Sequence, residues 1–79
     1  MKKTTIFLNT ISDVKSFVNI VCKYDFSVDL VSGRYSVDAK SIMGIFSLDL
    51  SRPVELEVHS TDEAACERFF EEIKQFTIK

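Results

Sequence analysis

Alternating apolar and polar residues predict four β-strands in this chain, over residues 4–8, 26–31, 35–39 and 54–58. In the first segment Ile6 and Leu8 share one face, because successive side chains of a strand point to opposite sides. The second and third segments are separated by Ser32 and Gly33, a pair typical of a tight hairpin turn. The fourth alternates apolar residues with glutamates, which indicates a strand that is buried on one face only.

Two longer segments have the spacing of amphipathic helices. The first begins at Ser12 and Asp13, which can cap a helix and favour its dipole, and extends to about Lys23. The second begins at Ser60 and Glu63, which have the spacing of a capping box, and runs nearly to the C-terminus. The apolar residues that recur at helical spacing are Val14, Phe17, Val18 and Val21 in the first, and Ala65, Cys66, Phe69, Phe70, Ile73 and Phe76 in the second.

Residues 37–48 connect the third strand to a short apolar segment. The period changes at Ser41, and Ile42, Met43 and Phe46 follow at helical spacing, with Gly44 limiting the length of the helix. Ser41 is therefore predicted to be the N-cap of a short helix. A free hydroxyl at the positive end of a helix is also a place that favours an added phosphate group.

The predicted order of elements is strand, helix, strand, strand, short helix, strand, helix. One sheet that is half-buried by amphipathic helices on a single face accounts for this order, which is an α+β fold. Residues 1–79 have neither a linker nor a repeat, and they are expected to form a single domain. This size allows a core without disulfides.

Composition and charge exclude several classes of function. Hydrophobic residues at 46% and charged residues at 28% are typical of an ordinary globular chain. A net charge of −2 argues against direct binding of nucleic acid, which needs clustered Lys and Arg. No apolar run approaches the roughly 18 residues of a membrane span, and no leader peptide is recognisable, so we expect a cytoplasmic protein.

The two cysteines, Cys22 and Cys66, lie far apart and have no metal-site spacing. They are expected to be buried thiols, and no metal or cofactor is predicted.

Several segments resemble the HPr family, the small phosphocarrier proteins of the bacterial phosphotransferase system. The segments that carry the resemblance are Lys23-Tyr24-Asp25, Val28-Asp29-Leu30 and above all Lys40-Ser41-Ile42-Met43-Gly44, which is similar to the regulatory serine motif of the family in low-GC Gram-positive bacteria. The resemblance spans nearly the whole chain. It implies an open-faced β-sandwich with the order βαββαβα, a four-stranded antiparallel sheet in the order 1-4-2-3 and three helices on one face.

The phosphocarrier reaction of that family depends on a histidine just before the first helix, in a Gly-x-His-x-Arg-Pro pattern. This chain has Asn9-Thr10-Ile11-Ser12-Asp13-Val14 there, without the histidine, arginine, proline or glycine. Thr10 and Ser12 would form stable phosphoesters, and Asp13 is favoured as a capping residue over an acyl-phosphate carrier. His59, the sole histidine, is predicted on the outer side of the fourth strand, away from the carrier position.

The resemblance therefore implies a regulatory, non-carrier relative, similar to the catabolite-repression homologues of HPr. In that interpretation Ser41 is phosphorylated by an enzyme that resembles HPr kinase/phosphorylase, and the protein is a substrate and not an enzyme. The predicted partner surface consists of Ile42, Met43 and Phe46, together with Lys15 and Asn19 of the first helix. Its partners would be such a kinase, a transcriptional regulator or another component of the phosphotransferase system.

Two alternatives stay open at this point. In one, the fold is an interaction module that is never phosphorylated, and Ser41 is only a cap. In the other, the protein carries phosphate on an unconventional residue. The chain is expected to be a monomer or a weak homodimer, because a shortened first loop favours strand exchange.

Overall fold

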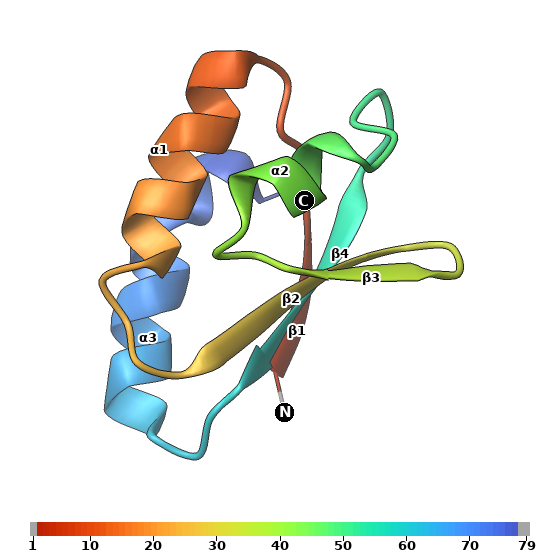
Figure 1. Ribbon diagram of the computed structural model, residues 1–79. Coiled ribbons are helices and arrows are strands. Elements are labelled where there is room, and N and C mark those ends of the chain that lie inside the picture. The colour runs from red at the N-terminus through yellow and green to blue at the C-terminus, as the bar shows by residue number, and fades with distance from the viewer. Residues whose placement is uncertain (1, 78–79) are drawn as a thin grey trace.

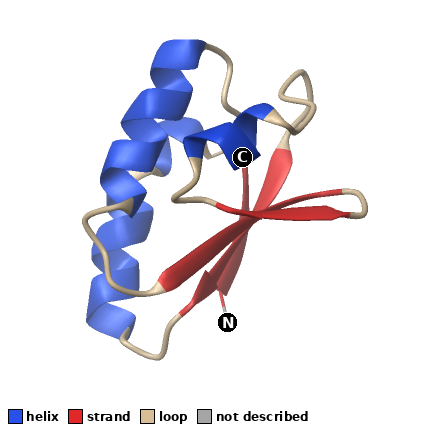
Figure 2. Ribbon diagram, viewed as in Figure 1, coloured by secondary structure: helices blue, strands red, loops and turns tan. Residues whose placement is uncertain are grey.

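The computed structural model describes residues 2–77 and confirms the predicted α+β architecture. The helices lie on one side of a twisted antiparallel sheet, and the strands follow the predicted order 1-4-2-3 (Figure 1). Figure 2 separates the two layers by colour. The elements are β1 (Lys2–Ile6), α1 (Ile11–Val21), β2 (Ser27–Ser32), β3 (Tyr35–Asp38), α2 (Ile42–Phe46), β4 (Val54–His59), α3 (Glu63–Glu72) and the 3-10 turn η1 (Lys74–Phe76).

The core lies between the sheet and the helices. Phe17 of α1 and Phe69 of α3 are fully buried against the inner face of the sheet. Leu56 and the two valines of β4 are buried on that face. Burial of each such side chain contributes about 1.5–3 kcal/mol. The alternation of β4 is confirmed, because its valines and leucine are buried and its glutamates lie on the open face.

The hairpin turn between β2 and β3 requires a glycine. Gly33 has φ of +60°, a conformation that residues with a side chain rarely adopt. The predicted hairpin is confirmed, but its turn is Gly33-Arg34 and not Ser32-Gly33, because Ser32 is the last residue of β2 and pairs with Tyr35.

The starts of two helices differ from the predictions. The N-cap of α1 is Thr10 and not Ser12, because Thr10 Oγ1 accepts a hydrogen bond from the Asp13 amide at 3.0 Å. The N-cap of α3 is Asp62, which accepts from the Ala65 amide at 3.1 Å. Ser60 instead accepts from the Asp62 amide, so the predicted capping box was wrong by two residues.

Three further predictions need correction. The first strand covers Lys2–Ile6, so it begins earlier than predicted and ends before Leu8, although Leu8 is buried. The first helix ends at Val21, where hydrogen bonds from the amides of residues 23 and 24 close the last turn. Cys66 is buried as expected, but Cys22 is exposed because it is the C-cap of α1.

Candidate functional site

The predicted short helix α2 is present, and Ser41 caps it. Ser41 Oγ accepts a hydrogen bond from the Gly44 amide at 3.2 Å, and the Ser41 carbonyl accepts from the Ile45 amide at 3.0 Å. The Ser41 residue is exposed, so its hydroxyl lies at the surface. The capping prediction is therefore confirmed, and the capping hydroxyl remains accessible to a partner.

Gly44 keeps the space beside this hydroxyl free. A Cβ at position 44 would lie 3.3 Å from Ser41 Oγ and 3.4 Å from Val37 Cβ. The first separation is tight enough that Ser41 Oγ would have to shift by a few tenths of an ångström, whereas the second is an ordinary van der Waals contact. Gly44 therefore supplies both the amide that binds Ser41 and the room that its hydroxyl occupies.

The apolar residues of α2 divide between the core and the surface. Ile45 is fully buried, and Ile42 is half-buried against the core. Met43 and Phe46 are 75% and 41% exposed. Because residues 41–48 contain no charged side chain, the exposed side of α2 is apolar and electrically neutral.

Lys15 and Asn19 are both exposed on α1, and α1 packs beside α2 (Figure 1). Within residues 2–77 neither side chain makes a hydrogen bond or an ion pair with α2. The fold therefore brings α1 and α2 together. The five residues of the predicted partner surface, which are Lys15, Asn19, Ile42, Met43 and Phe46, are not joined by hydrogen bonds or ion pairs between the two helices.

One exposed apolar residue was missed by the sequence analysis. Ile11, the first residue of α1, is 65% exposed. It precedes Val14 by three residues, so helical spacing alone assigns it to the buried face. Its exposure follows from its position in the first turn, where the helix extends past the core.

The start of α1, where the HPr resemblance expects a carrier histidine, is closed by local hydrogen bonds. Asp13 Oδ2 accepts from the Asn9 amide at 3.1 Å, while the Asp13 amide donates to Thr10. Both groups of Asp13 thus stabilise the chain reversal into the helix. This geometry agrees with a capping role for Asp13.

His59 is exposed at the end of β4, as predicted. Its Nε2 lies 2.9 Å from Oδ2 of Asp29 on the neighbouring strand β2. In Figure 1, β4 ends at the opposite end of the molecule from the start of α1. His59 therefore does not occupy the position of a carrier residue beside α1.

Residues 2–77 contain neither a metal site nor a membrane-spanning helix. No group of three or more His, Cys, Asp or Glu side chains in this part of the chain could hold a metal ion. No helix in the same range is long and apolar enough to cross a membrane.

Comparison with solved structures places the fold among phosphocarrier proteins. HPr-C-His from Thermoanaerobacter tengcongensis superposes with a TM-score of 0.76 at 27% identity, covering 95% of this chain and 92% of that one. HPr from Bacillus anthracis has a TM-score of 0.67 at 20% identity, covering 90% of this chain and 94% of its own. Crh of Bacillus subtilis, a catabolite-repression protein that crystallised as a swapped dimer, has a TM-score of 0.65 at 23% identity, with coverage of 94% and 88%.

The sequence itself was compared with curated proteins and with family models. No curated protein matches it. The family described as "PTS HPr component phosphorylation site" matches residues 13–78, which is most of the chain. The chain therefore belongs to the HPr family of the phosphotransferase system, as a divergent member.

Proposed function

We propose that this protein is a regulatory member of the HPr family that acts through phosphorylation of Ser41 and through docking of partner proteins on α2. The observation that carries the proposal is the exposed Ser41 hydroxyl at the start of a helix whose surface is apolar and uncharged. A phosphate group on this oxygen would lie close to backbone amides that lack a helical partner. No acidic side chain follows in the first turn of α2 to repel it.

The absence of a suitable carrier residue supports regulation over phosphate transfer. The single histidine is at the far end of the sheet and pairs with Asp29, and Asp13 is occupied in capping α1. Phosphoesters of Thr10 or Ser41 would be too stable to pass a phosphoryl group on readily. In this role the protein is a substrate and a binding partner, and it is not an enzyme.

The proposed docking surface consists of the exposed Met43 and Phe46 of α2, together with Ile42 of the same helix and the exposed Lys15 and Asn19 of the neighbouring α1. Exposed apolar side chains that are grouped on a small domain are typical of binding sites for other proteins. A phosphate on Ser41 would add about −1.5 to −2 charges next to the uncharged α2 part of this surface. Phosphorylation would thereby change which partners bind it, among them an HPr kinase/phosphorylase, a transcriptional regulator or a component of the phosphotransferase system.

The experiment is incubation with a bacterial HPr kinase/phosphorylase and ATP, followed by intact-mass measurement. We expect one added phosphoryl group on the native chain and none on Ser41→Ala. An HPr that carries the regulatory serine serves as the control for kinase activity. If that control is phosphorylated and the native chain is not, the regulatory proposal is wrong.

A second candidate is an interaction module that is never phosphorylated. The hydrogen bond between Ser41 Oγ and the Gly44 amide favours it, because this bond gives the hydroxyl a structural role without any phosphate. The same kinase experiment separates the two candidates. Unconventional phosphate transfer is tested with enzyme I and phosphoenolpyruvate, which should label neither the native chain nor Asp13→Ala.

A further inference from the structure

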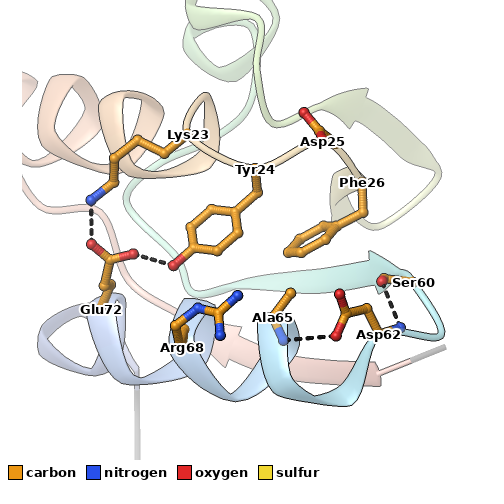
Figure 3. A pocket seen from close by; sticks show the side chains of 9 residues that line it. All are labelled: Lys23, Tyr24, Asp25, Phe26, Ser60, Asp62, Ala65, Arg68 and Glu72. Atoms are coloured by element: carbon orange, nitrogen blue, oxygen red, sulfur yellow. Dashed lines mark hydrogen bonds and ion pairs between the residues drawn. The ribbon is translucent and has the colours of Figure 1, made fainter.

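A second site candidate lies away from α2, in the groove between the loop after α1 and α3 (Figure 3). Its volume is about 650 Å³, within the range of small-molecule sites. One wall is formed by Ala65, Arg68 and Glu72, which share a face of α3 because they are three and four residues apart. The opposite wall is formed by the rings of Tyr24 and Phe26, whose centroids are 5.2 Å apart at an interplanar angle of 32°.

The acidic group at one end of the groove is already neutralised. Glu72 accepts hydrogen bonds from both the Lys23 ammonium and the Tyr24 hydroxyl. These two bonds hold the pKa of Glu72 below its usual value, so its carboxylate is ionised at neutral pH. Partial burial, together with the bond to Glu72, raises the pKa of Tyr24 to about 12, so the phenol keeps its proton.

Arg68 is different, because its charge has no partner. Its guanidinium lies inside the groove, between Tyr24 and Ala65 (Figure 3). Within residues 2–77 it makes no hydrogen bond and no ion pair. Glu72, four residues along the helix and thus within reach of an arginine, is turned to Lys23 and Tyr24 instead.

The other carboxylates near Arg68 form no ion pair with it within residues 2–77, and this includes Glu71, which lines an adjoining pocket together with Arg68. Asp62 at the far end accepts from the Ala65 amide as the cap of α3. Asp25 points away from α3 in Figure 3. The groove therefore contains one free guanidinium beside two aromatic rings.

This arrangement selects a class of ligand. A guanidinium can donate two parallel hydrogen bonds to a planar carboxylate. The rings of Tyr24 and Phe26 pack on each other and on Phe69, and the parts of them that line the groove offer an apolar surface to a flat group. Asp62 lies at the end of the groove opposite to the neutralised Glu72, and its carboxylate favours a ligand with a single negative charge over the double charge of a phosphate group.

We propose that this groove binds a small carboxylate that bears a flat apolar group, with the carboxylate on Arg68 and the flat group against Tyr24 and Phe26. The site shares no residue with the Ser41 surface. It is therefore independent of the regulatory proposal, and either can fail without the other.

The test is a titration of the ¹⁵N-labelled full chain, followed by amide chemical shifts. Benzoate is the probe, acetate lacks the ring and benzamide lacks the charge. We expect saturable shifts at Tyr24, Ala65 and Arg68 with benzoate, weaker binding of acetate and no saturable shift with benzamide. Absence of saturation with benzoate, or equal binding of either control compound, would overturn the proposal.

Two arginine variants complete the test. Arg68→Gln should weaken benzoate binding about tenfold or more, as expected when a charge-assisted pair of hydrogen bonds is lost. Arg52→Gln is the matched control, because Arg52 pairs with Asp49 outside the groove and its loss should leave binding unchanged. Arg68 is exposed, so its variant should keep the dispersed amide spectrum of the native chain. Unchanged benzoate affinity in Arg68→Gln would contradict the assignment of the anchor.

Discussion

The starts of α1 and α2 are built on the same hydrogen bond, yet they differ in what they leave accessible. In both, an exposed hydroxyl accepts from the amide three residues later, Thr10 from Asp13 at 3.0 Å and Ser41 from Gly44 at 3.2 Å. At α1 the third residue is an aspartate, which also binds the Asn9 amide. At α2 it is a glycine, which adds neither a charge nor a side chain.

The residue three positions after the N-cap, Asp13 in α1 and Gly44 in α2, therefore decides which N-cap hydroxyl can receive a phosphate. A phosphate on Thr10 would face the Asp13 carboxylate at close range, and like charges in one helical turn repel. A phosphate on Ser41 would meet an uncharged first turn and the exposed Met43 side chain. The two N-caps have the same local geometry, but they differ in how well they can accommodate a phosphate group because of one side chain.

The largest expected effect comes from replacing Gly44 of α2 with aspartate, the residue that α1 has at the same distance from its N-cap. Gly44→Asp should reduce the rate of Ser41 phosphorylation by HPr kinase/phosphorylase at least about tenfold, because the new carboxylate both crowds Ser41 Oγ and repels the incoming phosphate. The rate is measured by intact mass against time, with circular dichroism as the check on folding.

Gly44→Ala is the matched control for that variant. It adds the Cβ without the charge, so its rate should fall between those of the native chain and Gly44→Asp. Equal rates for native and Gly44→Asp would show that the third residue does not distinguish the two caps.

The next effect concerns the apolar surface beside Ser41. Met43→Ala and Phe46→Ala should each lower kcat/KM of the kinase for this substrate about tenfold, the size expected for an anchor of 1–2 kcal/mol at an interface. Tyr35→Ala is the matched control, because Tyr35 is 74% exposed and Met43 is 75% exposed, but Tyr35 lies on β3. A loss of the same size in Tyr35→Ala would contradict docking on α2.

A smaller effect is expected on the free energy of unfolding when each N-cap hydroxyl is removed. Thr10→Ala should lower the free energy of unfolding by about 1 kcal/mol, the usual value for a lost N-cap. Ser41→Ala should cost about half of that, because the five-residue α2 leaves the Gly44 amide close to water. Urea denaturation measures both. A larger loss for Ser41→Ala than for Thr10→Ala would favour a purely structural role for Ser41.

The smallest expected effect is that of Glu72→Gln on the pH dependence of stability, and this variant should not affect the N-caps at Thr10 and Ser41. The hydrogen bonds from Lys23 and Tyr24 hold the pKa of Glu72 below its usual value in the folded chain. A depressed carboxyl pKa stabilises the fold above the unfolded pKa, near 4.3, and this contribution is lost as pH falls through the lower folded value. Glu72→Gln should therefore flatten the loss of stability below about pH 4 in thermal unfolding, without any change in Ser41 phosphorylation. A steeper acid transition in Glu72→Gln would show that the bonds do not act as assigned.

The parts of the fold that depend on local sequence were predictable. The alternation of β4, the Gly33 turn and the cap at Ser41 follow from residue types and spacing, and each was confirmed. The residue types favour Ser12, directly before an aspartate, as the N-cap of α1, whereas Thr10 has the spacing that lets its hydroxyl accept a hydrogen bond from the Asp13 amide. Several residues near a helix start can cap it, and the path of the incoming chain selects one.

The groove at Arg68 could not be predicted in this way. Its walls come from residues 24–26 and 65–72, which are more than 30 positions apart and meet only because α3 packs beside the end of α1. The same holds for Cys22, whose exposure depends on where α1 ends. Helical spacing identifies the face of an element, but the position of its ends and its neighbours is set by tertiary packing.

The central claim is that Ser41, and not the similar cap at Thr10, receives the regulatory phosphate. Peptide mapping of the native chain after treatment with an active HPr kinase/phosphorylase and ATP tests this claim most directly. We predict a single phosphopeptide that contains Ser41, and an unmodified peptide that contains Thr10. Phosphate on Thr10, or an unmodified Ser41 under conditions that fully phosphorylate a control HPr, would contradict the account.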